Sequence, residues 1–416
     1  MRLEKYSFGV GDRFAHQGKA QLTAMIQARQ AGIDVVPVWN KSHREHSIIG
    51  TNPGDVRKEA DSAVAALNWA GSYHVDADHI NMGTVDGFIE CSDFFTLDVA
   101  DYIGRLPEEA DLKQFTEAAM KYAGSLRVPG LDEQVEITAE GIRSAGSRFL
   151  FAVKEAGRIY RHIEKAKGKD NFITEVSMDE TEAPQSPVEM FFILLMMAQE
   201  KIPAQTIAPK FTGRFNKGVD YCGDVAQFEK EFNADIAILQ FAVKEFGLPE
   251  NLKLSVHSGS DKFSIYPAIN RALKRFDAGL HLKTAGTTWL EELIGLAEAG
   301  GDGLDIAKEV YNRSLEKFDE LCAPYASVIE IDKAALPSAA EVEQWSGKEY
   351  AAALRHDPTC ADYNLNFRQL LHVGYKVAAQ MGTRFTDALV KDEAVIAEHV
   401  TGNIFQRHIK PVFLAE

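Results

Sequence analysis

A short apolar run that ends in polar residues, followed by a helical stretch, recurs along this chain of 416 residues. Each run has the length and the β-branched or aromatic content of a strand, and the stretches between most runs are rich in helix-forming Ala, Leu and Glu. The runs are Tyr6–Val10, Asp34–Val38, Ser72–Asp76, Phe172–Val176, Gln205–Pro209, Lys253–His257, Gly279–Lys283 and Ser327–Ile331. Strands that alternate with helices predict parallel βα units. Eight such units predict an α/β fold of the (β/α)₈ TIM-barrel type.

The spacing of the runs predicts two helical additions to this barrel. The third and fourth runs lie far apart, and residues 93–165 between them carry several helical patterns. We expect a helical insertion there, after the third strand, which either covers the mouth of the barrel or forms a separate subdomain. Residues 338–416 are predicted to form C-terminal helices, with Ser338 and Ser346 as N-caps. The prediction is therefore a single barrel domain over residues 1–416 that contains both additions.

The charge of the chain restricts its partners. The formal net charge is −16, whereas nucleic acids and anionic membranes bind basic surfaces. The longest apolar stretch, Met190 to Ala198, is too short to span a bilayer. We therefore expect neither nucleic acid nor membrane as a partner. A small anionic substrate is compatible with a local pocket of Lys and Arg, and a homo-oligomer is compatible with the sequence.

The cysteines and the N-terminal segment indicate a cytoplasmic protein. Cys91, Cys222, Cys322 and Cys360 match neither the spacing of a metal knuckle nor a disulfide framework. We expect them to be reduced thiols, as in the cytoplasm. The segment that begins Met-Arg-Leu-Glu-Lys-Tyr has no apolar run long enough for a signal peptide.

Ionisable residues follow five of the predicted strands in succession, at the point where each strand ends. Catalytic groups of a (β/α)₈ barrel gather at the carboxyl ends of its strands, so we expect these side chains to converge. His79 follows the third run, His257 ends the sixth and His281 lies in the seventh. A single polar strand end is explained by solvation, but a succession of them with three histidines predicts an active site.

His79 and His257 are the best candidates for metal ligands. Imidazole suits Zn²⁺ and its neighbours, and open catalytic sites take three protein ligands plus water or substrate. Zn²⁺ is the favoured ion, with Mn²⁺, Co²⁺, Ni²⁺ and Fe²⁺ as alternatives. Asp224 is the preferred third ligand, although it can equally be the N-cap of the helix that begins at Val225. Its rivals are Asp220, Glu175 and His281.

Two carboxyl groups are candidates for proton transfer. Asp78 directly precedes His79, so it can carry a proton to or from a substrate held on the metal; alternatively it caps a loop or orients the ligand. Glu182 follows the fourth run beyond a short polar turn. On the opposite side of the substrate from Asp78 it would serve as the second acid or base. The alternative for Glu182 is a solvated loop charge.

Basic residues at the same strand ends are candidates for binding a substrate carboxylate. This substrate-binding set is Lys210, Arg214, Lys217, His281 and Lys283. The chain has no GxGxxG or P-loop motif, which argues against a dinucleotide cofactor.

Three longer motifs resemble those of the bacterial tagaturonate epimerases. They are His-Val-Asp-Ala-Asp-His at 74–79, Phe-Asn-Lys-Gly-Val-Asp-Tyr at 215–221 and Ser-Val-His-Ser-Gly-Ser-Asp-Lys-Phe at 255–263. The resemblance extends from Tyr6 to about Lys283 and is weaker in the C-terminal helices. It implies an isomerase of hexuronate catabolism that interconverts tagaturonate and fructuronate.

A more distant resemblance links the chain to the class II, metal-dependent aldolases. It implies Asp78 as the proton-transferring acid, His79 and His257 as metal ligands, and Glu182 as the opposite acid. The chain departs from that family in one respect. The aldolases have another histidine before their Ser/Gly-rich loop, where this chain carries Lys217, Asp220 and Asp224.

The implied reaction inverts a carbon that is β to the ketone. The hydrogen on that carbon is not acidic, so simple enolisation cannot invert it, whereas retro-aldol cleavage followed by re-addition can. One alternative is a sugar aldolase of class II type that releases its fragments. Another is a non-catalytic barrel subunit of a tagatose-bisphosphate aldolase. A segment of such subunits resembles the stretch Gly9-Val10-Gly11-Asp12-Arg13-Phe14 of this chain.

Overall fold

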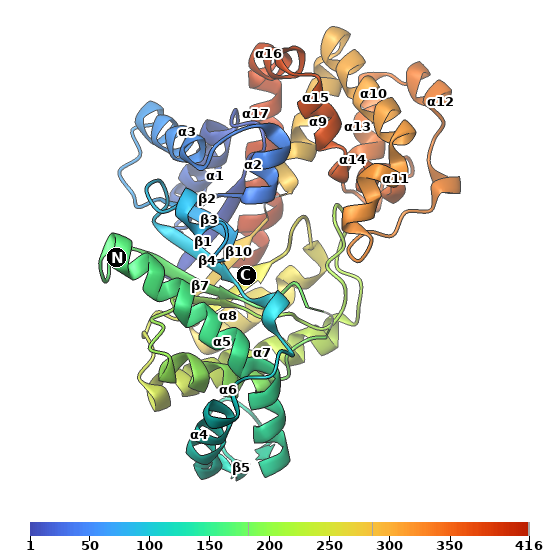
Figure 1. Ribbon diagram of the computed structural model, residues 1–416. Coiled ribbons are helices and arrows are strands. Elements are labelled where there is room, and N and C mark those ends of the chain that lie inside the picture. The colour runs from blue at the N-terminus through green and yellow to red at the C-terminus, as the bar shows by residue number, and fades with distance from the viewer. Residues whose placement is uncertain (182, 285, 415–416) are drawn as a thin grey trace.

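Eight parallel strands form a closed barrel at the centre of the molecule, as the recurring βα pattern predicts (Figure 1). The computed structural model describes residues 1–181, 183–284 and 286–414. The strands are β1 (Tyr6–Gly11), β2 (Val36–Ser42), β3 (His74–Ile80), β4 (Phe94–Asp98), β7 (Ile173–Ser177), β8 (Thr206–Ala208), β9 (Lys253–His257) and β10 (Leu280–Lys283). They follow this order around the barrel, and β10 pairs with β1.

One predicted strand is wrong and another was missed. Residues 327–331 form no strand; the backbone N–H and C=O of Glu330 are bonded to the side chain of Gln369 instead. The missing strand is β4, which lies within the segment 93–165 predicted to be helical. Only the short 3₁₀ helix Val85–Gly87 separates β4 from β3, so the alternation of strand and helix breaks there and conceals it.

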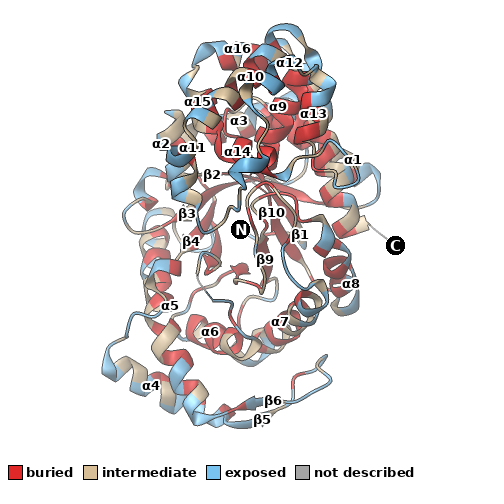
Figure 2. Ribbon diagram, turned by 90° about the vertical axis from the view of Figure 1, so that its right-hand side faces the viewer, coloured by how far each residue is buried: buried red, intermediate tan, exposed pale blue. Residues whose placement is uncertain are grey.

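Helices surround the barrel and bury their inner faces against it (Figure 2). This ring consists of α1 (Gly18–Gln30), α3 (Pro53–Ala66), α5 (Ala139–Lys167), α6 (Pro187–Gln199), α7 (Val225–Phe246), α8 (Tyr266–Phe276) and α9 (Thr287–Ala299). The short helix α2 (His43–Ile49) follows β2. In the described ranges, every helix is too short or too polar to cross a membrane.

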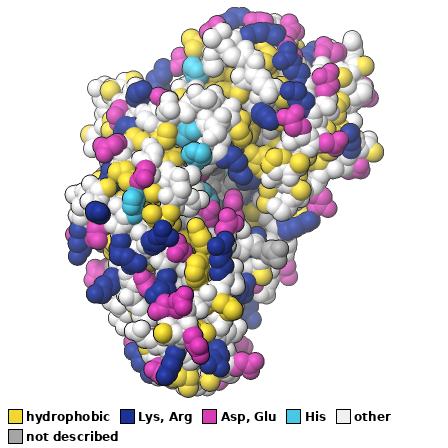
Figure 3. All heavy atoms as spheres, viewed as in Figure 1, with side chains coloured by type: hydrophobic (Ala, Val, Ile, Leu, Met, Phe, Trp, Pro, Cys, Tyr) yellow, Lys and Arg dark blue, Asp and Glu magenta, His cyan; other side chains and the backbone are white. Residues whose placement is uncertain are grey.

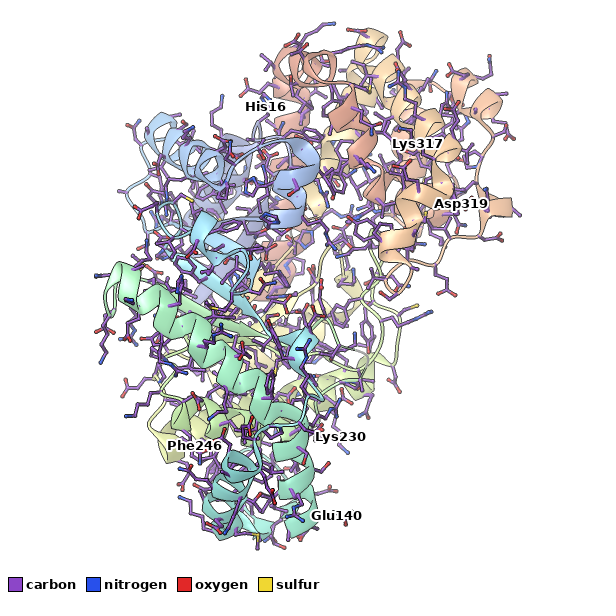
Figure 4. The ribbon with its side chains drawn as sticks, in the orientation of Figure 1. His16, Glu140, Lys230, Phe246, Lys317 and Asp319 are labelled. Carbon is purple, nitrogen blue, oxygen red and sulfur yellow. The ribbon has the colours of Figure 1, made fainter. Side chains whose placement is uncertain are left out.

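The insertion after β4 packs on the outside of this ring. It contains α4 (Glu109–Ala119) and the hairpin β5 (Gly124–Leu126) with β6 (Val135–Ile137). Phe115 packs on Phe192 of α6, and Tyr122 packs on Phe246 at the end of α7. Figure 2 shows these elements beyond α6 and α7, at the edge of the molecule. In Figure 4 the same end is marked by Glu140 and Phe246.

The C-terminal helices contact loops at the carboxyl ends of the strands. They are α10 (Gly301–Glu316), α11 (Phe318–Cys322), α12 (Ala339–Gln344), α13 (Gly347–Leu354), α14 (Leu365–Val373), α15 (Tyr375–Gln380), α16 (Thr383–Lys391) and α17 (Glu393–Gly402), followed by the π-helix Asn403–Leu414. Ser338 and Ser346 are N-caps with complete capping boxes, as predicted. The N–H of Lys217, in the loop after β8, donates to the C=O of Val328. Lys317 and Asp319 mark these helices in Figure 4.

A buried carboxylate, Asp261, joins the C-terminal helices to the loop after β9. Its oxygens accept hydrogen bonds from Arg368 Nη2 at 2.8 Å, His408 Nε2 at 3.0 Å, His356 Nδ1 at 3.2 Å and Thr287 Oγ1 at 3.2 Å. Burial raises the pKa of Asp261, but Arg368 and the two histidines outweigh burial and hold it well below its usual value. The loop that follows His257 is thereby fixed to residues about a hundred positions further along the chain.

The interior of the barrel changes from apolar to ionised along its axis. Leu3, Val38, Phe94 and Ile173 form a buried apolar cluster at the amino ends of the strands. Side chains on one face of a strand recur every second residue, so the next inward positions are Asn40, Thr96 and Glu175. The apolar layer therefore closes one end of the barrel, and the polar layer above it faces the other.

We predict that Arg368→Met destabilises the fold by about 3–5 kcal/mol, because it leaves Asp261 buried without its permanent cation. The matched control is Arg384→Met on α16, which breaks a half-exposed ion pair with Glu309 and should cost at most about 1 kcal/mol. Equilibrium unfolding in urea measures both variants. Equal stability of the two variants would contradict the role given to Asp261.

Candidate metal and active site

A backbone irregularity at the end of β3 places two consecutive side chains on the same side. Alternation along a strand would send Asp78 and His79 to opposite faces. Instead the pairing of β3 with β4 shifts register between Ala77 and Ile80, and His79 has a φ of 51°, in the left-handed region. That conformation is costly for a residue with a Cβ, and such strain is concentrated at functional sites. It allows His79 Nδ1 to donate to Asp78 Oδ1 at 2.7 Å.

His79, Asp179 and His257 form a cluster at the carboxyl ends of β3, β7 and β9. One ligand atom of each lies within 4.8 Å of the others. His257 Nδ1 is 3.3 Å and His79 Nε2 is 3.6 Å from the carboxylate of Asp179. Both nitrogens are buried, and neither has a hydrogen-bond partner in the described part of the chain. Two unpartnered imidazole nitrogens that converge beside a carboxylate are unusual unless a cation binds there.

The second nitrogen of each imidazole is held by its own carboxylate. His79 Nδ1 donates to Asp78 Oδ1, and His257 Nε2 donates to Glu175 Oε1, each at 2.7 Å. In the neutral imidazoles that a metal ion requires, these bonds would leave the lone pairs on His79 Nε2 and His257 Nδ1, the nitrogens that face Asp179. A carboxylate behind each histidine is the usual arrangement around a catalytic metal. Two imidazoles and one carboxylate with further positions open fit Zn²⁺ or a similar divalent ion.

The electrostatic field of the cluster favours positive charge. Burial lowers the pKa of His257, but Asp179 and Glu175 outweigh it and raise this pKa to about 9. Burial likewise opposes protonation of His79, yet Asp78 and Asp179 raise its pKa well above the usual value. A field that stabilises imidazolium also stabilises a divalent cation in the same place.

Lys283 lies beneath this cluster, inside the barrel. Its Nζ is 2.7 Å from Asp76 Oδ2, 2.6 Å from Asp78 Oδ1 and 3.8 Å from Glu175 Oε1. Burial lowers the pKa of Lys283, but Asp76, Asp78 and Glu175 raise it above its usual value, so the ammonium stays charged. Burial raises the pKa of Asp76 to about 6, against the opposing effect of Lys283.

Asp224, the preferred third metal ligand of the sequence analysis, lies outside the cluster. Asp179 is the carboxylate that lies beside the two histidines. Asp224 is exposed and caps α7, where its Oδ1 accepts from the N–H groups of Ala226 and Gln227. Asp220, an alternative third ligand, instead accepts a hydrogen bond from Ser264 Oγ. Asp179 lies two residues beyond β7, in the acidic segment Asp179-Glu180-Thr181-Glu182 that follows the fourth predicted strand. Nothing in that segment distinguishes Asp179 from its acidic neighbours.

Three of the predicted substrate-binding side chains already have partners within the protein, and the other two pair with no carboxylate among the described residues. Lys283 is enclosed by carboxylates, and His281 is fully buried and bonded to Ser7 Oγ. Burial lowers the pKa of His281 to about 3. Arg214 is exposed and paired with Glu330.

Lys210 and Lys217 remain half-buried near the strand ends, and in the described ranges no carboxylate pairs with either ammonium. Gly259, in the loop after His257, lies against the side chain of Lys217. The second proposed acid, Glu182, lies outside the described residues.

Sequence reasoning also missed Asp76 and Thr96, both of which are hydrogen-bonded to Lys283. Thr96 lies on β4, the strand that was not recognised. Asp76 precedes Asp78 by two residues and ends the third predicted strand, where it was given no role in the site. In Figure 3 the surface is hollowed where the C-terminal helices meet the barrel, and acidic, basic and histidine side chains gather around this hollow (Figure 3).

Comparison with known proteins identifies related sequences and structures. A family model described as tagaturonate epimerase matches residues 1–411. The tagaturonate/fructuronate epimerase of Thermotoga maritima is 29% identical over 419 residues, which cover 97% of this chain and 80% of that protein. A glycerol complex of the fructuronate-tagaturonate epimerase of Cohnella laeviribosi superposes with a TM-score of 0.81 at 24% identity, covering 99% of this chain and 82% of that one.

The native structure of the Cohnella enzyme gives a TM-score of 0.79 at 23% identity, with the same coverage of both chains. At these identities the two structures support the shared fold. The family follows from the sequence model, which matches almost the whole chain. This protein belongs to the tagaturonate epimerase family, and it is an enzyme of the isomerase class.

Proposed function

We propose that this protein is a divalent-metal-dependent epimerase that interconverts D-tagaturonate and D-fructuronate by retro-aldol and aldol steps. The observation that carries the metal dependence is the convergence of His79 Nε2 and His257 Nδ1 on Asp179, each imidazole held from behind by a carboxylate. The family match supports the pair of substrates. We place this activity in hexuronate catabolism in the cytoplasm.

The stereochemistry of the reaction excludes simple enolisation and favours cleavage and re-formation of a C–C bond. The inverted carbon is β to the ketone and carries a hydroxyl, so its C–H bond cannot be ionised by enolisation. Removal of the hydroxyl proton allows the neighbouring C–C bond to break, which gives an aldehyde and an enediolate. The aldehyde turns its other face to the enediolate, the bond re-forms, and the alkoxide takes up a proton. No atoms are gained or lost.

The metal would be held by His79, His257 and Asp179. Zn²⁺ is the ion that this ligand set favours, with Mn²⁺, Co²⁺, Ni²⁺ and Fe²⁺ as alternatives. When bound, it supplies a Lewis acid that stabilises negative charge on the ketone side of the substrate.

Asp78 is the residue proposed to take the hydroxyl proton. Its Oδ1 is occupied by His79 and Lys283, whereas no hydrogen bond from the described residues reaches its Oδ2. Burial raises its pKa, but Lys283 and His79 outweigh burial and hold this pKa well below the usual value. Asp78 is therefore ionised at neutral pH, and its weak basicity favours return of the proton. Glu182 is proposed to serve the opposite face of the aldehyde.

The substrate carboxylate is proposed to bind Lys217 and Lys210. Their ammonium groups are half-buried and lack carboxylate partners among the described residues. Arg214 and Lys283 are already neutralised by Glu330 and by the interior carboxylates. The C-terminal helices, which contact the loop that contains Lys217, would exclude water while both fragments are held.

The test of this function is incubation of EDTA-stripped protein with D-tagaturonate, with and without each divalent metal, followed by chromatography. We expect metal-restored conversion to D-fructuronate without shorter products. Accumulation of two shorter carbon chains would identify a sugar aldolase instead. Full conversion by the stripped protein would contradict the metal dependence, and absence of conversion with every metal would contradict the substrate pair.

We predict that Asp179→Ser lowers metal affinity by more than the about 10–100-fold that loss of an outer-shell partner causes. Asp224→Ser is the matched control, because serine still caps α7 and the side chain lies outside the cluster. Elemental analysis after dialysis measures bound metal in both variants. Metal loss in Asp224→Ser with retention in Asp179→Ser would reverse the assignment of the third ligand.

We predict that Asp78→Asn lowers kcat by about 10²–10⁴-fold while metal stays bound. Asparagine keeps a side-chain oxygen that accepts from His79, but it cannot take the hydroxyl proton. Steady-state kinetics and metal analysis on the same preparation separate these effects. A variant with the kcat of the unmodified enzyme would show that Asp78 is not the base.

A further inference from the structure

We propose that Lys283 is a positioning residue that couples the two metal-binding histidines to each other. This inference rests on the metal site of the proposed function and adds a role for a residue that does not itself reach the metal. Lys283 contacts both carboxylates that orient the imidazoles, Asp78 behind His79 and Glu175 behind His257. It would therefore set the position of both ligands at once.

The side chain of Lys283 crosses the interior of the barrel to reach these partners. It starts on β10, beside Gly9 of β1, and ends at Asp76 and Asp78 of β3. A Cβ at Gly9 would lie 2.8 Å from Lys283 Cγ, so a side chain at this position would block the path. The glycine on β1 thus leaves room for the lysine stem.

The ammonium group has as many acceptors as it has protons. An ammonium donates three hydrogen bonds. Lys283 Nζ has three acceptors within hydrogen-bond distance: Asp76 Oδ2 at 2.7 Å, Asp78 Oδ1 at 2.6 Å and Thr96 Oγ1 at 3.0 Å. No proton is left for a substrate carboxylate, which distinguishes this role from the substrate-binding role predicted from the sequence.

The contacts made by Lys283 extend to both imidazoles through shared oxygen atoms. Asp78 Oδ1 accepts from Lys283 and also from His79 Nδ1 at 2.7 Å. Thr96 Oγ1, which accepts from Lys283, can donate its single proton either to Asp76 Oδ2 at 2.9 Å or to Glu175 Oε1 at 3.2 Å. That same oxygen accepts from His257 Nε2 at 2.7 Å. Each histidine is thus oriented by a carboxylate that pairs with Lys283, Asp78 at 2.6 Å and Glu175 at 3.8 Å.

Charge balance requires a cation at this place. Asp76, Asp78 and Glu175 are buried together, and among the described residues Lys283 is the lysine that pairs with all three. A neutral side chain would leave these carboxylates facing one another in a medium that screens charge poorly. They would rotate apart, which would move the acceptors of the imidazole N–H groups and disturb the ligand geometry.

The test compares Lys283→Met with Lys253→Met. Methionine matches the length of the lysine stem and removes only the ammonium. Lys253 is a second buried lysine, at the start of the neighbouring strand β9, and its Nζ donates to the C=O of Glu4 at the amino end of the chain. The readouts are Zn²⁺ affinity, from competition with a chelator, and the visible absorption spectrum of the Co²⁺-loaded protein, which reports ligand geometry.

We expect Lys283→Met to bind Zn²⁺ about 10–100-fold more weakly, with an altered Co²⁺ spectrum, whereas Lys253→Met keeps both properties. If Lys283→Met does not fold, Thr96→Val replaces it and should weaken Zn²⁺ binding in the same direction. A folded Lys283→Met variant, or a Thr96→Val variant, with unchanged affinity and spectrum would overturn the inference alone. An unmodified protein that binds neither ion would overturn the proposed metal site as well.

Discussion

The pairing of Lys283 with the buried carboxylates of β3 and β7 is the interaction on which the site depends. Buried charges are tolerated only when they are paired and hydrogen-bonded. Here the pairing leaves Asp78 and Glu175 ionised and fixed, so each can hold one imidazole with its lone pair toward Asp179. The geometry of the proposed metal ligands at the barrel mouth thus depends on the pairing of Lys283 with these carboxylates inside the barrel. The apolar cluster around Phe94 closes the barrel on the other side of these carboxylates.

The insertion after β4 and the C-terminal helices differ in how they contact this site. The insertion after β4 packs on the outside of the helical ring and has no described contact with the cluster. The C-terminal helices reach the loops that follow β8 and β9, where Arg368 and His356 bond Asp261. Because Asp261 lies four residues after His257, the C-terminal helices stabilise the loop that begins at a proposed metal ligand. Parts of the chain distant in sequence thereby form one site.

The sequence predicted the barrel and the strand ends better than the partners of each residue. His79 and His257 could be chosen because an imidazole at a strand end is distinctive, and the structure brings the two together. Asp179 could not, since its acidic segment holds several equivalent carboxylates, while Asp224 lies at a helix start that explains it as a cap. β4 was missed because only a short 3₁₀ helix, and no α-helix, separates it from β3. Residues 327–331 resemble a strand, but the backbone of Glu330 bonds to the side chain of Gln369. Lys283 was assigned to the substrate because sequence does not reveal the carboxylates that surround it.

The central claim is that a divalent cation binds between His79, Asp179 and His257. The most direct measurement is anomalous X-ray diffraction from crystals of the protein loaded with Co²⁺, collected on both sides of the cobalt absorption edge. The account predicts one strong anomalous peak bonded to His79 Nε2, His257 Nδ1 and a carboxylate oxygen of Asp179. A peak bonded to other residues, or no peak at this cluster in protein that elemental analysis shows to be loaded, would contradict it.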